Sequence, residues 1–237
     1  MPPRLVATIG LHASASTWVF NVVRELMIAR LGVSAVVAAY AEDLSELPDA
    51  SSREGRHLVI KSHHGSPGLD EWLAAEQPLM VLSVRDPRDA CLSMAQRFKA
   101  PLDRTAQWIS ADCDRLERLA QQNHALLRFE DRFFAGAAAA EGLARLLGLS
   151  LANETIEAIT ERYTTEAVRS FAQKLAELPP DRVAMVGASH LMDRTTQIHG
   201  PHIGDSRSGK WRDLPSPTQA ELTRRFAPFL DRFGYQH

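Results

Sequence analysis

Short apolar runs alternate with segments of helical periodicity through the first 130 residues of this 237-residue chain. Five of these runs have strand length, as expected of strands buried on both faces of a parallel sheet. They cover residues 5–9, 33–39, 57–61, 79–84 and 125–129. Residues 17–31 carry apolar side chains at helical spacing, and a second helix is expected near Pro87, where the missing N–H costs little. The alternation predicts a doubly wound α/β fold of three layers, α/β/α, with a central parallel sheet.

The remainder of the chain has a helical pattern, interrupted by one long irregular segment. The expected helices cover residues 137–147, 153–163, 166–178 and 217–233. Residues 187–210 are rich in Gly, Ser, His and Asp without periodicity, and a loop of that length in a compact domain is usually functional. No boundary of a second unit is visible, so we expect residues 1–237 to form a single domain.

Charge balance and cysteine count exclude several classes of protein. The chain has 27 Lys and Arg against 29 Asp and Glu, which argues against a nucleic-acid partner bound by bulk positive charge. The two cysteines, Cys91 and Cys113, form neither a disulfide framework nor CxxC zinc spacing. No apolar run approaches the roughly 20 residues that cross a bilayer, and no signal-peptide pattern is present. We expect a cytoplasmic protein without a transmembrane segment, in which a local cluster binds any anion.

Polar residues follow three of the expected strands, at the edge where parallel sheets bind ligands. After the first strand, the segment from Gly10 to Trp18 consists largely of small residues before a helix, and such a turn presents backbone N–H groups to an anion. Gly10 and Thr17 fit the NTPase phosphate loop, but Ala15 and Ser16 replace its second glycine and its lysine. A nucleoside triphosphate site is therefore a weak interpretation, and an ordinary Ser/Thr helix cap is the alternative.

The second polar group is Lys61-Ser62-His63-His64. Alternation along a strand places Lys61 and His63 on one face, and a histidine beside a lysine tends to stay neutral and can act as a base near pH 7. A polar strand terminus is the alternative interpretation. A metal pair of His63 and His64 is disfavoured, because adjacent side chains in a strand point apart.

The third polar group begins with Arg85-Asp86-Pro87-Arg88-Asp89 and ends at Ser93. An arginine at a strand end and a hydroxyl on the following helix can converge on one phosphate. The alternative is a helix start at which Asp86, Arg88 and Asp89 form surface salt bridges.

Taken together, these groups resemble the sulfotransferases that use 3′-phosphoadenosine 5′-phosphosulfate (PAPS). The family's P-K-S-G-T-T-W segment corresponds to residues 12–18, its K-[ST]-H segment to residues 61–63, and its V-R-[ND]-P-[KR]-D-x-x-x-S segment to residues 84–93. Residues 126–131 resemble the family's next strand, and residues 208–235 resemble its G-[DK]-W-[RK] segment and its terminal Gly-Tyr. The matches follow the family's order and cover nearly the whole chain.

The resemblance implies a P-loop-NTPase-like sulfotransferase fold and transfer of a sulfuryl group from PAPS to a hydroxyl or amine, with no metal. It implies that His63 is the general base, that Lys61 supports the transferring oxygens, and that Trp18 lies against the adenine unless it is a core aromatic. The nucleotide-binding residues that it implies are His12, Ala13, Ser14, Ala15, Ser16, Thr17 and Trp18 in the loop, Arg85 and Ser93 at the 3′-phosphate, and Thr165, Arg207, Ser208 and Gly209.

Two departures from the family pattern concern charge. The family's loop lysine falls on Ala13, and we expect Lys61 or the neighbouring His12 to substitute for it. The family's basic pair before G-x-W falls on residues 204–206, which are not basic, and Arg207 is the nearest replacement. These departures keep two alternatives open: a nucleotide-binding sulfotransferase homologue without turnover, and a small-molecule kinase with a degenerate phosphate loop.

The acceptor is expected to be a small molecule or a carbohydrate, and the sequence does not indicate an oligomeric state. Residues 187–204 are expected to cover the acceptor pocket, where His190, His199 and His202 either line it or lie in solvent.

Overall fold

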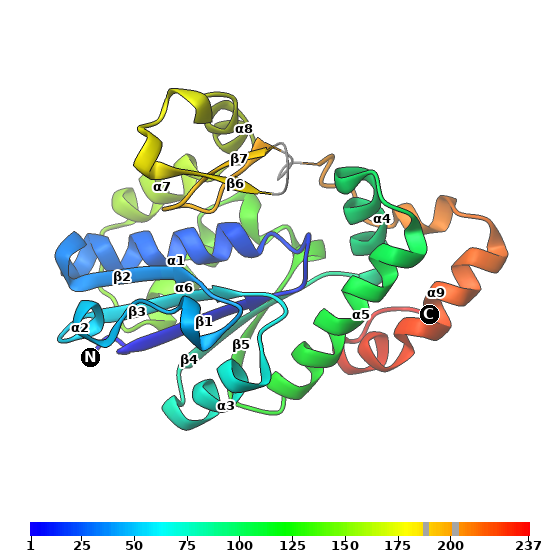
Figure 1. Cartoon of the computed structure of the whole chain (residues 1–237), viewed down its shortest axis with the longest axis horizontal. Helices are drawn as coiled ribbons and strands as arrows, with labels where there is room; N and C mark the ends of the chain where they lie inside the picture. The colour runs from blue at the N-terminus through cyan, green and yellow to red at the C-terminus, as the bar shows by residue number, and fades with distance from the viewer. Residues whose placement is uncertain (187–189, 201–203) are drawn as a thin grey trace.

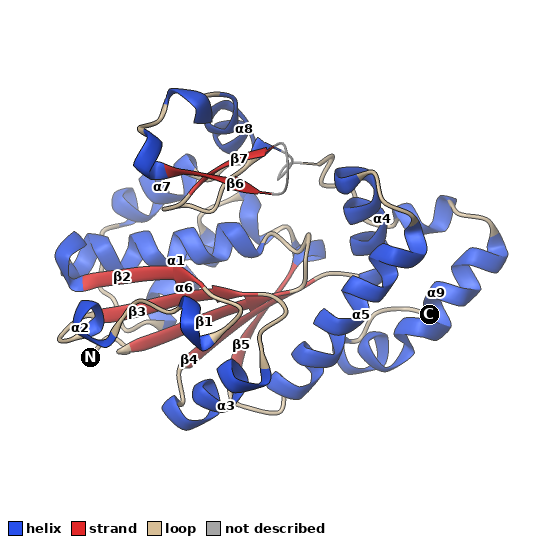
Figure 2. Ribbon diagram, viewed as in Figure 1, coloured by secondary structure: helices blue, strands red, loops and turns tan. Residues whose placement is uncertain are grey.

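A five-stranded parallel sheet forms the middle layer of the computed structural model, which describes residues 1–186, 190–200 and 204–237 (Figures 1 and 2). The strand order is β2-β3-β1-β4-β5. The strands are β1 (Leu5–Gly10), β2 (Val36–Tyr40), β3 (His57–Ser62), β4 (Leu79–Val84) and β5 (His124–Arg128). Helices flank the sheet, so the predicted three-layer fold with a central parallel sheet is confirmed.

Two apolar cores lie on opposite faces of the sheet because successive strand residues point to opposite sides. Val6, Val59 and Val81 pack into the core under the first group of helices, whereas their neighbours Ala7 and Ile60 belong to the other core. The first group comprises α1 (Ser16–Leu31), α6 (Ala138–Leu146) and α7 (Asn153–Arg162). The second comprises α3 (Pro67–Glu76), α4 (Pro87–Phe98), α5 (Leu102–Leu119) and α9 (Ser216–Phe233).

A hairpin and a short helix lie outside α1 (Figure 1). The hairpin consists of β6 (Val183–Val186) and β7 (His190–Asp193), and the helix is α8 (Thr165–Gln173). Asn21 and Arg24 of α1 donate hydrogen bonds to the carbonyls of Thr196 and Thr195, which fix the turn after the hairpin against α1. A four-residue helix, α2 (Ala50–Arg53), precedes β3.

The structure corrects several predicted elements. Residues 33–35 form a 3-10 turn after Gly32, which has a positive φ of 89°, and the second strand starts only at Val36. Helix α5 was not predicted, although its apolar residues recur at helical spacing; its buried face also carries Thr105, Asp112 and Arg115. Part of the loop expected over residues 187–210 is strand, since β7 lies within it.

The carboxyl ends of the central strands lie side by side. In β1, Thr8 is paired with Lys61 of β3, and Gly10 is paired with Ser83 of β4. Only glycine fits at position 10, because a Cβ there would lie 2.2 Å from Ser83 Oγ. The segments that follow β1, β3 and β4 therefore meet at one edge of the sheet. Among the described residues, no helix combines the length and apolarity needed to span a bilayer.

Candidate active site

A pocket of about 600 Å³ opens at this edge. Every predicted site residue lines the pocket, as far as the described residues define it, except Ser14, Arg207, Ser208 and Gly209. The segments after β1, β3 and β4 contribute to it together with residues from α8 and from the chain near Lys210. The strand order therefore assembles residues that are far apart in the sequence.

The loop after β1 has an unusual backbone. Ala13 and Ala15 lie in the left-handed region, with φ of 61° and 62°, which costs about 1–2 kcal/mol for each residue that has a Cβ. The fully buried Ser14 does not line the pocket, and its side chain ties the loop to the sheet. Its Oγ donates to the Leu11 carbonyl at 2.6 Å and lies 3.0 Å from Ser83 Oγ of β4. Helix α1 starts at Ser16 with no side-chain cap from the described residues, so the Ser/Thr-cap interpretation is wrong.

Because the first N–H groups of a helix have no intrahelical acceptors, the start of α1 offers donors to an anion in the pocket. The side chains of Ser16 and Thr17 line the same pocket, and both are largely buried.

Burial keeps His63 neutral, and its hydrogen bond to the loop fixes which ring nitrogen carries the proton. Its Nδ1 lies 2.5 Å from the Gly10 carbonyl, which can only accept, so Nδ1 carries the proton and Nε2 carries the lone pair. Nε2 lies 3.4 Å from Ser16 Oγ, at the start of α1. Burial lowers the pKa of His63 well below its usual value, and the nearby His12 and Lys61 lower it further. His63 is thus unprotonated near pH 7.

Lys61 lies beneath the loop. Its Nζ donates to Thr17 Oγ1 at 3.0 Å and lies 5.4 Å from the centre of the Tyr40 ring. Burial lowers the pKa of Lys61 to about 7; Glu42 opposes this shift and Arg97 adds to it. The ammonium charge of Lys61 is therefore only partly developed at neutral pH, and an anion in the pocket would stabilise it.

Arg85 and Ser93 meet, as predicted. The Arg85 guanidinium donates to Ser93 Oγ at 3.2 Å, to the Ala13 carbonyl at 3.0 Å and to the Arg207 carbonyl at 2.8 Å, and it lies 4.0 Å over the Phe129 ring. Its Nε–H is buried and has no hydrogen-bond partner in the described part of the chain. A buried donor without a partner is costly, so this guanidinium suits an anionic ligand.

Lys210, and not the Arg207 side chain, contacts Ser93. The Lys210 Nζ donates to Ser93 Oγ at 3.2 Å and to Asp205 Oδ1 at 3.1 Å, and Lys210 lines the pocket. The Arg207 guanidinium instead pairs with Asp213 on the surface, and the residue reaches Arg85 through its carbonyl. The expected replacement was Arg207, and the structure places Lys210, three residues further along the chain, beside Ser93.

The other charged residues of the third motif are structural and buried, so the surface-salt-bridge alternative is wrong. Asp86 caps α4 through the Arg88 N–H, and the fully buried Arg88 lies 3.6 Å over the Trp211 ring. Asp89 accepts the N–H groups of Gly209 and Trp211, at 2.5 and 3.0 Å. These contacts fix the segment that carries Lys210.

Comparison with solved structures identifies the fold. The structure is similar to that of mouse sulfotransferase SULT7A1 complexed with PAP, with a TM-score of 0.65 and 14% identity over 98% of this chain and 89% of that chain. It is also similar to retinol dehydratase in complex with retinol and PAP, with a TM-score of 0.61 and 15% identity over 97% of this chain and 82% of that chain. The chain has the sulfotransferase fold. No family model and no curated protein matches it in sequence.

The sulfotransferase fold places the remaining predicted residues as follows. Trp18 is in the core, with its ring 5.4 Å from Phe133, and it also lines the pocket, so the two interpretations of this residue are compatible. Thr165, the first residue of α8, lines the pocket as well. His199 lines the pocket and His190 begins β7, whereas His202 lies outside the described residues.

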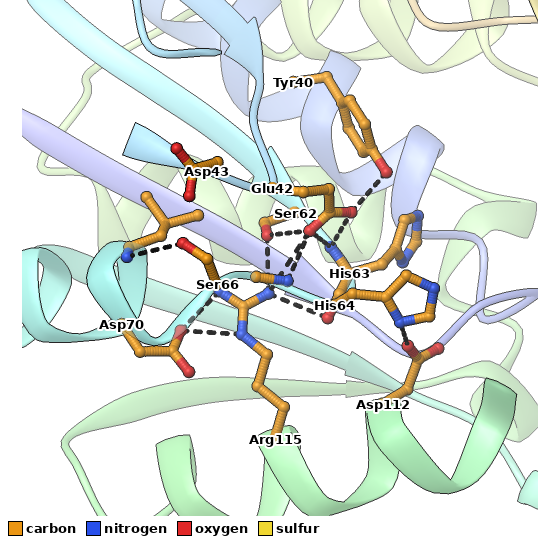
Figure 3. Close-up of polar contacts among 12 residues, drawn as sticks. Tyr40, Glu42, Asp43, Ser62, His63, His64, Ser66, Asp70, Asp112 and Arg115 are labelled. Atoms are coloured by element: carbon orange, nitrogen blue, oxygen red, sulfur yellow. Dashed lines mark hydrogen bonds and ion pairs between the residues drawn. The ribbon is translucent and has the colours of Figure 1, made fainter. Parts of the chain in front are cut away.

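A buried ionic network supports the backbone of His63, and sequence reasoning missed it (Figure 3). The Glu42 carboxylate accepts the His63 N–H at 2.9 Å and the Gly65 N–H at 2.7 Å. The fully buried Arg115 donates to the His63 carbonyl at 2.9 Å and to Ser62 Oγ at 2.6 Å. Although burial opposes it, hydrogen bonds from Tyr40, Gly65 and Ser62 lower the pKa of Glu42. The lowered pKa keeps Glu42 ionised, and the contacts of Glu42 and Arg115 fix the backbone of His63 from both sides.

His63 and His64 follow the end of β3, and both of their rings lie beside the ring of His12, at centroid distances of 3.9 and 4.8 Å, so the expectation that adjacent side chains point apart is wrong here. The His64 Nδ1 lies 2.8 Å from Asp112 Oδ1 of α5. The His12 Nδ1 lies 2.6 Å from the other oxygen, Oδ2, and the His12 ring stacks on that of His63 at 3.9 Å. In the sequence, the only signal for Asp112 is that it shares a face of α5 with apolar residues.

Proposed function

We propose that the protein transfers a sulfuryl group from PAPS to a hydroxyl group of a small-molecule acceptor. The observation that carries this proposal is the convergence of a neutral histidine base, a buried lysine and an Arg85–Ser93 pair on one pocket of the sulfotransferase fold. PAPS, when bound, would supply the sulfuryl group and a leaving group with a second phosphate.

The residues present fit a doubly phosphorylated nucleotide. The start of α1 and the hydroxyls of Ser16 and Thr17 suit one phosphate. The unpartnered Nε–H of Arg85, together with Ser93 and Lys210, suits a second one. Two separate anion sites in one pocket favour adenosine 3′,5′-bisphosphate over a nucleotide with a single phosphate chain.

Two side chains would carry the chemistry. His63 Nε2 accepts the proton of the attacking hydroxyl, since its Nδ1 proton is committed to the Gly10 carbonyl. Lys61 takes over the charge-stabilising role of the lysine that Ala13 replaces, because its Nζ already contacts the loop at Thr17. Positioned charges of this kind are most effective in a pocket from which water is excluded.

The acceptor side of the pocket is apolar in part. Val186 of β6, Met192 of β7 and Ile198 line it beside His199. We infer an acceptor with an apolar body and one reactive hydroxyl, in preference to a carbohydrate. The retinol dehydratase structures contain retinol or androsterone together with PAP, and both are compounds of that kind.

Calorimetry and thermal unfolding with nucleotides test the proposal. Adenosine 3′,5′-bisphosphate should bind and raise the melting temperature, adenosine 5′-monophosphate should bind much more weakly, and ATP with Mg²⁺ should have little effect. Transfer of labelled sulfate from PAPS to a panel of apolar alcohols should follow. Absence of heat with the bisphosphate at millimolar concentration would refute the proposal, and binding without transfer or hydrolysis would support the non-catalytic homologue.

Nucleotide binding should depend on pH through Lys61. Its pKa is lowered to about 7 in the free protein, and a bound anion must raise it, so binding above pH 7 takes up a proton. Affinity for adenosine 3′,5′-bisphosphate should therefore fall as pH rises above 7, by up to about tenfold per pH unit. Calorimetry in buffers of different ionisation enthalpy measures the uptake directly.

The control for this prediction compares two lysines. Lys61→Met should abolish the proton uptake and flatten the pH dependence of affinity, whereas Lys174→Met, at an exposed position, should change neither. An unaltered pH dependence in Lys61→Met would show that another group takes up the proton.

A further inference from the structure

Three potential metal ligands converge beside the pocket from three separate segments. His12 belongs to the loop after β1, His64 follows β3, and Asp112 lies in the middle of α5. The nitrogen and oxygen atoms that they offer all lie within 4.8 Å of one another. None of the proposed steps of sulfuryl transfer uses His64 or Asp112.

Asp112 is the centre of this cluster and is fully buried. Its Oδ2 accepts the backbone N–H of His12 at 2.9 Å and lies 2.6 Å from the Nδ1 of the same residue. Its Oδ1 lies 2.8 Å from the Nδ1 of His64 (Figure 3). A buried carboxylate requires positive charge beside it, which either a protonated imidazole or a metal cation bound by both imidazoles would supply.

Two imidazole nitrogens and one carboxylate form a donor set that suits zinc and its neighbours among the transition metals. We propose that His12, His64 and Asp112 bind a divalent ion of this class through the two Nδ1 atoms and the carboxylate. Ligand atoms of a tetrahedral zinc site lie about 3.4 Å apart, as bond lengths of about 2.1 Å require. The Nδ1–oxygen distances of 2.6 and 2.8 Å must therefore lengthen when a metal binds, and the two imidazole nitrogens must move closer together. The half-exposed ring of His64 can turn to allow this, and solvent at His64 can supply further ligands.

The surrounding charges permit a cation here. The nearby Arg115 guanidinium is paired with Asp70 and lies 3.9 Å from Glu42, so two carboxylates offset its charge. The His63 side chain is directed to Gly10 and Ser16 and is not part of the set. An ion at Asp112 would nevertheless lie close to the proposed base, because the His12 ring stacks on that of His63.

Metal titration of the full chain tests the proposal without any assay of sulfate transfer. Co²⁺ should produce the visible absorption bands of a low-symmetry nitrogen–oxygen site, and one equivalent of Zn²⁺ should displace it. His64→Ala should weaken Zn²⁺ binding on the order of 100-fold, since it removes one of three protein ligands. Because His64 is half-exposed, this variant should fold, and an unchanged response to adenosine 3′,5′-bisphosphate would verify it.

The matched control is His237→Ala. His237 also pairs with a carboxylate, Asp231 at 2.7 Å, but on the surface and without the second histidine of the Asp112 cluster. Its replacement should leave Zn²⁺ affinity unchanged. Absence of the Co²⁺ bands, or equal Zn²⁺ affinity in His64→Ala and the unaltered protein, would overturn the proposal and leave a hydrogen-bonded His–Asp–His cluster. Either result is independent of whether the protein transfers sulfate.

Discussion

Replacing His63 with alanine should lower the turnover of sulfate transfer about 100-fold or more, the usual contribution of a positioned general base. Nδ1 of His63 donates its proton to the Gly10 carbonyl, so the lone pair of Nε2 is available to accept a proton beside Ser16 at the start of α1. Affinity for adenosine 3′,5′-bisphosphate should change much less, because His63 is neutral and contributes no charge. Steady-state rates at saturating acceptor, together with calorimetry, measure both quantities.

His124→Ala is the control for this variant, because His124 begins β5 at the opposite edge of the sheet. It should retain the full rate. A decrease of less than about threefold in His63→Ala, at saturating acceptor, would exclude His63 as the base.

Replacing Arg85 with alanine should weaken binding of adenosine 3′,5′-bisphosphate by about 2–3 kcal/mol, or roughly 30–150-fold, as expected for lost charge-assisted hydrogen bonds. Arg85 also binds the carbonyls of Ala13 and Arg207, so its removal can disturb the loop. Adenosine 5′-monophosphate separates the two effects. If Arg85 binds the 3′-phosphate, affinity for the monophosphate should hardly change.

Two variants, Arg207→Ala and Lys210→Ala, test which residue binds the 3′-phosphate beside Arg85. The structure favours Lys210, whereas the sequence pattern favoured Arg207. The Arg207 guanidinium pairs with Asp213 at the surface, so Arg207→Ala should bind the bisphosphate normally, whereas Lys210→Ala should weaken binding. If Arg207→Ala bound the bisphosphate much more weakly and Lys210→Ala bound it normally, Arg207 and not Lys210 would be the phosphate ligand.

Sequence patterns were sufficient for the layers of the fold because they depend on local periodicity. The apolar runs at β1, β3 and β4 are buried on both faces, and this pattern is visible without knowledge of their partners. Helix α5 has the same kind of local signal, since Leu102, Ile109 and Leu116 recur at helical spacing, and it could have been predicted; only the burial of Asp112 and Arg115 on that face could not. The hairpin of β6 and β7 has four-residue strands, too short to show alternation.

The site was predictable where residues follow a strand directly. Lys61, His63 and Arg85 all lie at strand ends, and parallel pairing then brings them to one edge. Glu42, Asp112 and Lys210 could not be placed, because their roles depend on contacts across 20 residues or more, with His63, His12 and Ser93. Long-range contacts of this kind are set by packing of the layers and have no local signature.

The loop after β1 keeps its shape without the residues that usually specify such a shape. Ser14 and Ser83 hold it from behind and Arg85 clamps its carbonyl, while two alanines adopt a conformation that favours glycine. These contacts therefore offset the strain of two alanines at positive φ, which glycines at the same positions would not have. The shape of this turn is therefore specified by the side chains packed around it and not by the residues of the turn itself.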